Sequence, residues 1–491
     1  MSSLKLQGIK AFSWDFLGKL ATHGTSFVVG IFLARMLDPS DFGLVAMVMI
    51  VVSMAGIFSD AGLSAALIQR RRVLSIHYSS VFFFNIIMGM ALTIVVFVSS
   101  PYIAGFYGDE RLISLTKAIS ISFLIAAFSS VQSTKLRKEL NYGLLTKIAF
   151  SSSLISGIVG VGFAFYGMGV WALVIQSLTQ GTLYNIFIWT KSRWNPKMEF
   201  SIKALSQLWR FGFHMFLSGV LNTLSSSLDT LIIGKIFPPA TLGYFNRAKT
   251  LNGMVVAYSS SSLLSVLFPI LSRVQNDLLR FQNIIKKTLG IIIFTAFFLL
   301  GVMYLVSYEL VVILFGEKWI QTVDYFKILV LSGFGYPISA LLVNVLSSRG
   351  KSKSFLRLEI YKKMLIPFNM LVLYFYGVEA FLYFLILTSC IAVYMNIAFA
   401  SREIEVSKKE MIKPILVEAA ITVSSVVVVA VATRDLSLSL YWLFLLKGSL
   451  FFLIYVGLNA TASTSPFTYF MGEFRPVFKK VKRSKIFKVK K

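Results

Sequence analysis

Long apolar runs follow one another along most of the chain, and short polar segments separate them. A helix needs about 20 mostly apolar residues to cross the ~30 Å hydrocarbon core of a bilayer. The runs do not alternate between apolar and polar residues as the strands of a membrane β-barrel do. The pattern predicts an all-α polytopic membrane protein with about fourteen transmembrane helices, at residues 11–35, 42–67, 79–104, 112–133, 142–165, 168–190, 209–236, 243–270, 284–308, 322–346, 355–376, 379–400, 413–433 and 437–460.

Three pairs of runs are divided only by short turn signals, at Gly167–Gly169, Gly377–Glu379 and Arg434–Asp435. Composition supports the membrane assignment, because 56% of the residues are hydrophobic and 14% are charged. Soluble domains carry about 25% charged residues. Three histidines and one cysteine leave little for metal or thiol chemistry, and we predict neither a metal site nor a cofactor.

The net charge of +27 follows the predicted topology. Lys and Arg concentrate in alternate segments, such as 70–72, 135–138 and 475–491, whereas the intervening loops carry few. Positive residues favour the cytoplasmic side, so both termini are expected in the cytoplasm. The basic tail, 461–491, is expected to lie on anionic phospholipid headgroups. Because the charge has this topological explanation, we predict no nucleic-acid binding.

The two halves of the chain share a motif at an offset of 200 residues. Pro39 corresponds to Pro239 and Gly43 to Gly243, and each motif closes the first run of a half and opens the second. Proline favours the start of a turn, and we expect glycine to adopt a backbone conformation that other residues avoid. The sequence therefore predicts an internal duplication.

The two motifs lie an even number of runs apart, so the repeats should be related by a pseudo-two-fold axis along the membrane normal. We predict two six-helix lobes plus two C-terminal helices. The expected segments are an N-lobe at 1–192, a cytoplasmic linker at 193–204, a C-lobe at 205–400, the last two helices within 401–460, and the tail.

Polar residues recur at helical spacing in the first run, with Lys19 and His23 on one face, and in the seventh, with Asn222 and Asp229. Charged groups in lipid cost about 2.5–3.5 kcal/mol at a helix centre on insertion scales, so they normally face a cavity. The two stripes predict a polar cavity between the repeats. Interhelical hydrogen bonding is the alternative interpretation.

Arg247 lies about one turn inside the eighth run, where a guanidinium can bind a diphosphate through two parallel hydrogen bonds or extend to the outer headgroups. Asp60 lies near the inner end of the second run. The predicted site comprises the substrate-binding residues Lys19, His23, Asn222 and Arg247 and the ion-coupling candidates His23, Asp60 and Asp229.

The sequence contains no Walker A loop, no His-Glu-x-x-His and no Gly-x-Ser-x-Gly motif. These absences exclude an ATP motor in this chain, and we predict no catalytic residue. The loops expected outside are short, which disfavours a membrane sugar polymerase or ligase, the alternative from another class. A non-transporting scaffold is a further alternative, which predicts tolerance of substitutions along both polar stripes.

Several motifs, in this order and spacing, resemble the polysaccharide transporters of the multidrug/oligosaccharidyl-lipid/polysaccharide exporter superfamily, and within it the Wzx-type flippases. The motifs are Phe32-Leu-Ala-Arg-Met-Leu-Asp-Pro-Ser-Asp-Phe-Gly43, Phe58-Ser-Asp-Ala-Gly-Leu-Ser-Ala-Ala-Leu-Ile-Gln69, Trp171-Ala-Leu-Val-Ile-Gln176, Leu228-Asp-Thr-Leu-Ile-Ile-Gly-Lys235, Gly243-Tyr-Phe-Asn-Arg-Ala248, Phe268-Pro-Ile-Leu-Ser-Arg273 and Phe315-Gly-Glu-Lys-Trp319.

The resemblance implies a bacterial inner-membrane flippase that works by alternating access, with a cationic cavity for an undecaprenyl-diphosphate-linked oligosaccharide. Lys19, His23 and Arg247 occupy regions comparable to essential cations of the related lipid II flippases, whereas the second run has Asp60 in place of a buried Arg. Polymerase and chain-length proteins of the same pathway are further candidate partners. Export of another lipid-linked glycan or of a small amphiphile is the alternative within transport.

Overall fold

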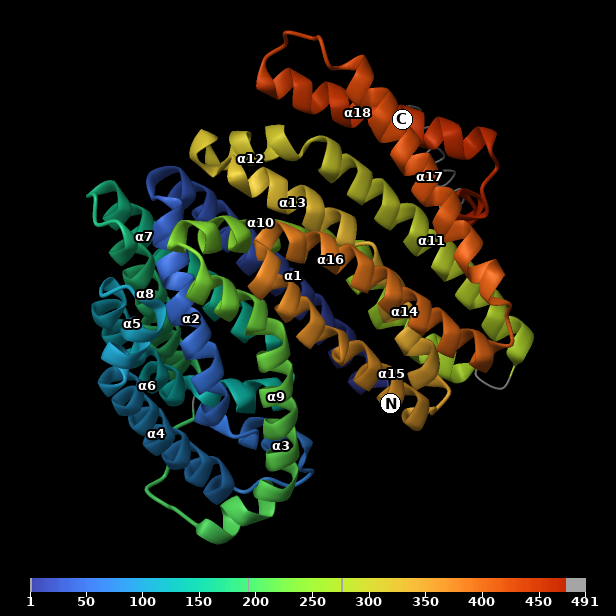
Figure 1. Cartoon of the computed structure of the whole chain (residues 1–491). Helices are drawn as coiled ribbons and strands as arrows, with labels where there is room; N and C mark the ends of the chain where they lie inside the picture. Colours follow the sequence, from blue (N-terminus) through green and yellow to red (C-terminus); the bar gives the residue numbers. More distant parts are fainter. Residues whose placement is uncertain (1, 193, 275–276, 474–491) are drawn as a thin grey trace, which may run out of the picture. The chain divides into compact units, whose positions relative to one another are not determined.

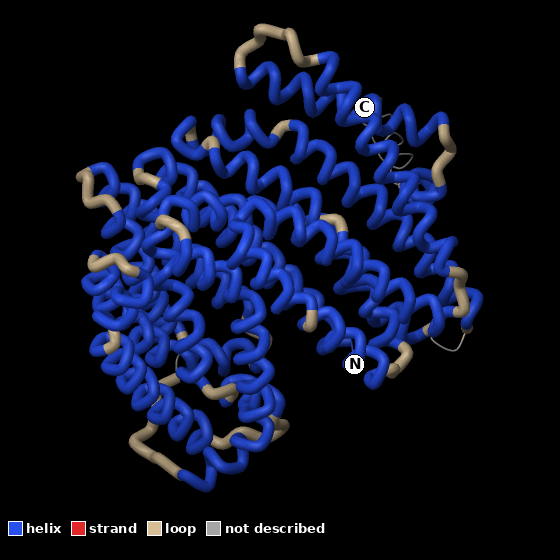
Figure 2. Tube along the Cα trace, in the orientation of Figure 1, coloured by secondary structure: helices blue, strands red, loops and turns tan. Residues whose placement is uncertain are grey.

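The computed structural model describes residues 2–192, 194–274 and 277–473, and every regular element within these ranges is a helix (Figures 1 and 2). The chain divides into two compact units, Met1–Asn246 and Arg247–Lys491. Residues 474–491, which include most of the predicted basic tail, lie outside the described residues.

The first unit contains nine helices among its described residues, and a tenth begins there and continues into the second unit. They are α1 (Ser2–Met36), α2 (Pro39–Asp60), α3 (Leu63–Gln69), α4 (Ser75–Val98), α5 (Ser100–Tyr107), α6 (Arg111–Lys138), α7 (Tyr142–Phe165), α8 (Val170–Lys191), α9 (Ile202–Ile236) and α10 (Pro239–Arg273).

The second unit continues in the same all-helical manner in its described part, with one 3-10 turn. Its elements are α11 (Leu278–Leu305), α12 (Ser307–Phe315), η1 (Glu317–Trp319), α13 (Gln321–Ser332), α14 (Gly335–Ser348), α15 (Ser352–Lys363), α16 (Leu365–Ile404), α17 (Lys408–Ala432) and α18 (Leu440–Thr461). A core cluster in its described part joins α11, α14, α16 and α17 through residues such as Phe281, Leu341, Ile397 and Met411.

Each of the fourteen predicted runs falls on helices, and 11 helices in the described residues are long and apolar enough to cross a membrane. The all-α polytopic fold class is therefore confirmed. The number of spans and the lobe symmetry stay predictions, as do the lobe boundaries. Helix α9, which follows the predicted linker, packs against α2, α3 and α4 within the first unit.

Several of the runs predicted as single helices are broken into two helices at points that the hydropathy pattern did not indicate. The run at 42–67 breaks between α2 and α3 because Ala61 (φ 46°) and Gly62 (φ 75°) are left-handed. Asp60 bridges the break, since its carboxylate accepts hydrogen bonds from Ser64 N at 3.0 Å and Ser64 Oγ at 2.6 Å. A Cβ at Gly62 would lie 2.1 Å from the carbonyl oxygen of Gly212 in α9, so Gly62 also permits a close helix crossing.

The predicted turns at Gly167–Gly169 and Gly377–Glu379 are confirmed. Helix α7 ends at Phe165 and α8 begins at Val170, while Gly377 has a non-helical φ of 83° inside α16. The run at 355–376 is also split, since α15 ends at Lys363 and α16 begins at Leu365.

The two duplicated motifs meet in the first unit in a reciprocal arrangement. A Cβ built on Gly43 would lie 1.8 Å from the carbonyl oxygen of Pro239, and one built on Gly243 would lie 2.0 Å from that of Pro39. Both glycines lie in the second turn of a helix, Gly43 in α2 and Gly243 in α10. The expectation of an unusual glycine backbone was therefore wrong, because close backbone packing is what requires these glycines.

Candidate functional site

A cavity of about 480 Å³ opens in the first unit beside α1. Four elements line it: α1, the C-terminal turn of α6, the N-terminal half of α7, and α8. The lining residues are Gly18, Lys19, Thr22, His23, Arg137, Tyr142, Leu145, Thr146, Ala149 and Tyr184. Lys19 and His23, which the sequence placed on one helical stripe, therefore face the same cavity.

Close packing of α1 on α7 forms one wall of this cavity. A Cβ at Gly18 would lie 2.2 Å from Thr146 Oγ1, so only glycine permits this approach without displacing Thr146. Thr146 Oγ1 donates a hydrogen bond of 2.9 Å to the Trp14 carbonyl oxygen, which links the two helices. Farther along the same pair, a Cβ at Gly157 would lie 2.4 Å from Val29 Cγ2. Small residues at such positions let membrane helices approach closely.

The tight turn between α6 and α7 supplies a cation and an aromatic ring to the same cavity. Leu140 adopts a left-handed φ of 57°, which reverses the chain, and the Asn141 side chain caps α7 by accepting from Leu144 N at 3.3 Å. Arg137, in the last turn of α6, and Tyr142, in the first turn of α7, both line the cavity.

Lys19, Arg137 and His23 line the cavity, and its lining includes no Asp or Glu among the residues whose side chains the structure describes. Sequence reasoning found Lys19 and His23 but missed Arg137, Tyr142 and Tyr184. Arg137 was assigned to the topological charge of a cytoplasmic loop, and only the helix arrangement shows that it also lines a cavity. Helical spacing cannot reveal such a contact between distant segments.

Asn222 and Asp229, on the second predicted stripe, do not line this cavity. Asn222 is exposed on α9. The Asp229 carboxylate accepts from Thr230 N at 2.7 Å and from Thr230 Oγ1 at 3.1 Å, and it has further contacts. Asp60, by contrast, lies in a half-buried polar cluster, where Asn85 Nδ2 donates to it at 3.4 Å in addition to the Ser64 donors.

Arg247 lies in the second unit against two buried aromatic rings. Its guanidinium carbon is 5.2 Å from the centroid of Phe315 and 5.6 Å from that of Trp319, at the end of α12 and in η1. A guanidinium over an aromatic face is attracted by the ring quadrupole, by about 0.5–2 kcal/mol. These contacts join the start of α10 to the α12–η1 turn.

A lysine at position 247 should be attracted to the two rings less strongly than the native arginine, because an ammonium is compact and strongly hydrated. A variant Arg247→Ala should lower the thermal unfolding midpoint of the purified protein, and Arg247→Lys should lower it less. The matched control is Arg280→Ala, which removes an exposed arginine from α11 of the same unit. Equal midpoints for Arg247→Ala and wild type would contradict a stabilising role.

Residues 32–324, more than half of the chain, match the family described as "Polysaccharide biosynthesis protein". The chain is 30% identical to the teichuronic acid biosynthesis protein TuaB of Bacillus subtilis over 286 residues, which cover 57% of this chain and 58% of TuaB. It is 26% identical to the lipopolysaccharide biosynthesis protein WzxC of Escherichia coli, with 70% of each chain covered.

The fold is similar to a solved structure of the lipid II flippase MurJ. The TM-score is 0.71 at 15% sequence identity, and the similarity covers 94% of this chain and 100% of the MurJ chain. The family match and these relatives confirm the resemblance to polysaccharide transporters that the sequence motifs indicated, and the similarity to MurJ shows the fold. This multi-pass helical membrane protein belongs to the polysaccharide biosynthesis protein family.

Proposed function

We propose that the protein is a flippase that moves an undecaprenyl-diphosphate-linked oligosaccharide from the cytoplasmic to the periplasmic leaflet of the inner membrane. The observation that carries this proposal is the cavity at which Lys19, His23 and Arg137 converge from α1 and α6. A diphosphate brings negative charge that must leave water before it can cross the membrane, and cations in a cavity offset that cost.

The roles of the lining residues follow from their chemistry. Arg137 can bind a phosphate through two parallel N–H donors, and Lys19 provides a compact point charge. Tyr142 and Tyr184 offer an aromatic face and a hydroxyl, which suit a sugar ring, while Thr22 and Thr146 add hydroxyl groups. The prenyl chain would remain in lipid, so the cavity needs to hold only the polar part of the substrate.

Asn222 and Arg247 remain candidate substrate-binding residues, although neither lines this cavity. We propose that Asn222 on α9 and Arg247 on α10 contact the substrate in a different conformation of the transport cycle. Substrate shifts the balance of conformations only by its differential affinity for them. Polymerase and chain-length proteins of the same pathway would receive the translocated unit.

Transport is expected to be ion-coupled, because the sequence has no ATP-binding motif. His23 is the favoured protonation point, since it lines the cavity beside Lys19 and a bound diphosphate would favour the imidazolium. Asp229 and Asp60 are the other candidates. Asp60 is the weaker one, because it already bridges the α2–α3 break.

We expect His23→Gln to abolish the response of transport to an imposed pH gradient in proteoliposomes, while leaving binding of the substrate measurable. Glutamine is polar and of similar size but does not titrate. The control is His214→Gln, which alters an exposed histidine of α9 outside the cavity. If His23→Gln and wild type respond equally to the gradient, the coupling site is elsewhere, and Asp229 is the next candidate.

We propose that both termini lie in the cytoplasm. Reporter fusions after Arg72, Lys138 and Lys353 should report a cytoplasmic location, and fusions near Gly108 and Glu317 a periplasmic one, because alternate segments carry the Lys and Arg residues. A periplasmic report after Lys353 would contradict the proposed topology.

The function is tested by deleting the gene and identifying, by mass spectrometry, the lipid-linked glycan that accumulates. We expect a complete oligosaccharide unit on a polyprenyl diphosphate to build up and to disappear when the wild-type gene is restored. Accumulation of polymer intermediates with normal units exported would instead indicate a polymerase or ligase.

A further inference from the structure

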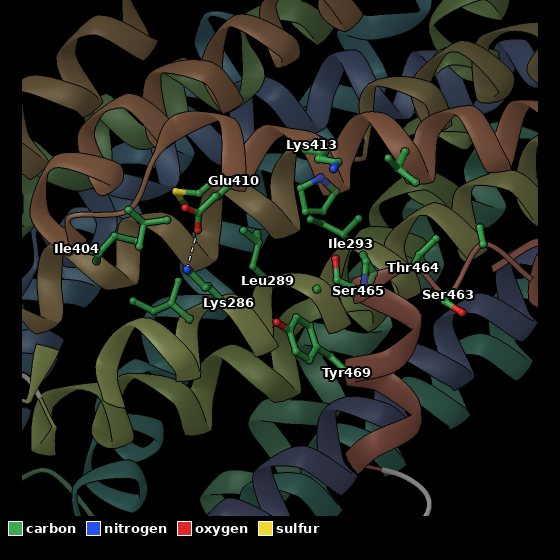
Figure 3. A pocket seen from close by; sticks show the side chains of 18 residues that line it. Lys286, Leu289, Ile293, Ile404, Glu410, Lys413, Ser463, Thr464, Ser465 and Tyr469 are labelled. Atoms are coloured by element: carbon green, nitrogen blue, oxygen red, sulfur yellow. Dashed lines mark hydrogen bonds and ion pairs between the residues drawn. The ribbon is translucent and has the colours of Figure 1, made fainter. Parts of the chain in front are cut away.

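A second cavity, of about 540 Å³, lies in the second unit between α11, α17 and the segment that follows α18 (Figure 3). Most of its wall is apolar, with Leu289 and Ile293 from α11, Met411 and Val417 from α17, and Pro466 from the segment after α18. It is separate from the cavity beside α1, and none of the predicted site residues lines it.

Charged residues border this apolar cavity near the N-terminal ends of two helices. Lys286 lies in the third turn of α11 and Lys413 in the second turn of α17. Figure 3 shows Lys286 paired with Glu410, with Nζ 2.7 Å from Oε2. The side chains of this pair are 38% and 57% exposed, so they remain accessible to a ligand at the cavity mouth. The lining charges leave an excess of one cation.

The wall contributed by the segment after α18 is fixed in two ways. A Cβ at Gly290 would lie 2.7 Å from Tyr469 Cδ2 and 3.3 Å from Pro466 Cα, so glycine permits the segment to pack directly on α11. Farther along the segment, the ring centroid of Phe470 lies 4.8 Å from that of Phe294 in α11. The segment therefore belongs to the folded unit, although we had assigned it to the tail.

A buried carboxylate holds the turn that begins this segment. Glu418 in α17 is fully buried, and its Oε1 accepts from Thr464 Oγ1 at 3.2 Å. Its Oε2 accepts from Tyr455 Oη at 2.8 Å and Asn459 Nδ2 at 3.2 Å, both in α18. Buried polar networks of this kind specify one arrangement of the surrounding elements. These hydrogen bonds tie Thr464, which lines the cavity, to α17 and α18.

We propose that this cavity binds one anionic phospholipid, with its phosphate at Lys286 and Lys413 and the upper part of an acyl chain along Leu289, Ile293 and Val417. Three features select this occupant: cations at the mouth, an apolar interior, and a location near the ends of helices that span a membrane. The volume lies within the roughly 300–1,000 Å³ range of small-molecule sites. A free phosphate would satisfy the cations but leave the apolar wall unused.

The test measures the thermal unfolding midpoint of the purified full-length chain in detergent, titrated with phosphatidylglycerol, phosphatidylcholine or inorganic phosphate. Phosphatidylglycerol is expected to raise the midpoint, whereas the other two probes should not. Native mass spectrometry should show one phosphatidylglycerol retained per chain. The double variant Lys286→Gln/Lys413→Gln should bind this lipid about tenfold more weakly, because both phosphate partners are lost.

The chain offers a matched control in Lys287→Gln/Lys409→Gln, which removes the same charge from the same two helices at exposed positions outside the cavity. Equal weakening in both double variants would mean general surface attraction and would overturn the proposal. A midpoint rise with inorganic phosphate equal to that with phosphatidylglycerol would overturn the lipid assignment.

A second variant, Val417→Trp, tests the cavity without changing its charge. The larger side chain should fill the space that the acyl chain needs, so retention of phosphatidylglycerol should fall although both lysines remain. If Val417→Trp retains the lipid as wild type does, the lipid does not occupy this cavity. This variant also keeps the proposal testable if the lysine variant fails to fold.

Discussion

Alanine at Gly43 or Gly243 is expected to lower both the thermal stability of the protein and its export activity. The added Cβ would lie 1.8 Å from the carbonyl oxygen of Pro239 or 2.0 Å from that of Pro39, and a backbone carbonyl cannot rotate away as a side chain can. Overpacking of this kind costs about 1–3 kcal/mol, which exceeds the ~1 kcal/mol that alanine gains over glycine in a helix.

The same helices contain matched controls. Gly56 in α2 and Gly253 in α10 have open space where a Cβ would be built, so Gly56→Ala and Gly253→Ala should be neutral or slightly stabilising. The measurement is the unfolding midpoint of the four single variants in detergent, followed by export in a deletion strain. Unfolding midpoints for Gly43→Ala and Gly243→Ala equal to those of the controls would show that the motifs do not need this close contact.

Removing the cations of the α1 cavity is the second change with a large expected effect. Lys19→Ala and Arg137→Ala should each lower export of the lipid-linked unit about 10–100-fold, since a hydrogen bond to a charged group contributes about 1.5–3 kcal/mol. Protein abundance should stay near that of wild type, because Lys19 and Arg137 are exposed and neither fills the core. Export is measured by polysaccharide produced in a deletion strain.

Two cations outside the cavity serve as controls for these variants. Lys147 lies on α7 outside the cavity, with Nζ 5.8 Å from the ring centroid of Trp14. Arg111 lies at the opposite end of α6 from Arg137 and pairs with Asp109 at 2.7 Å in an exposed contact, which is worth about 0–1 kcal/mol. Lys147→Ala and Arg111→Ala should export normally. A similar loss in all four variants would indicate a general charge effect.

The fold class could be predicted from sequence because a membrane span depends on length and hydropathy, which are local properties. The α2–α3 break at Ala61 and Gly62 escaped prediction because the apolar run at 42–67 continues on both sides of it and reads as one span. Asp60, which we assigned to ion coupling, bridges this break through hydrogen bonds with Ser64. The sequence also did not reveal why position 43 requires glycine, because the carbonyl group that packs against it belongs to Pro239, about 200 residues away.

Part of the candidate site was also predictable, because it depends on local spacing within one helix. Lys19 and His23 share one helix, and their spacing alone places them on one face. Arg137 and Tyr184 reach the same cavity from α6 and α8, and that convergence depends on how α1, α7 and α8 pack. Hydropathy and charge counts do not contain this information.

The most direct test of the proposed function uses the purified protein in proteoliposomes that contain a polyprenyl-diphosphate oligosaccharide in both leaflets. An enzyme added outside modifies only the exposed glycan, so continued modification reports movement between leaflets. Wild type should allow all of the glycan to be modified, whereas a variant with Lys19→Ala and Arg137→Ala should stop near the half initially exposed. If wild type also stops at the exposed half, or if the double variant equals wild type, the cavity beside α1 does not carry a lipid-linked oligosaccharide across the membrane.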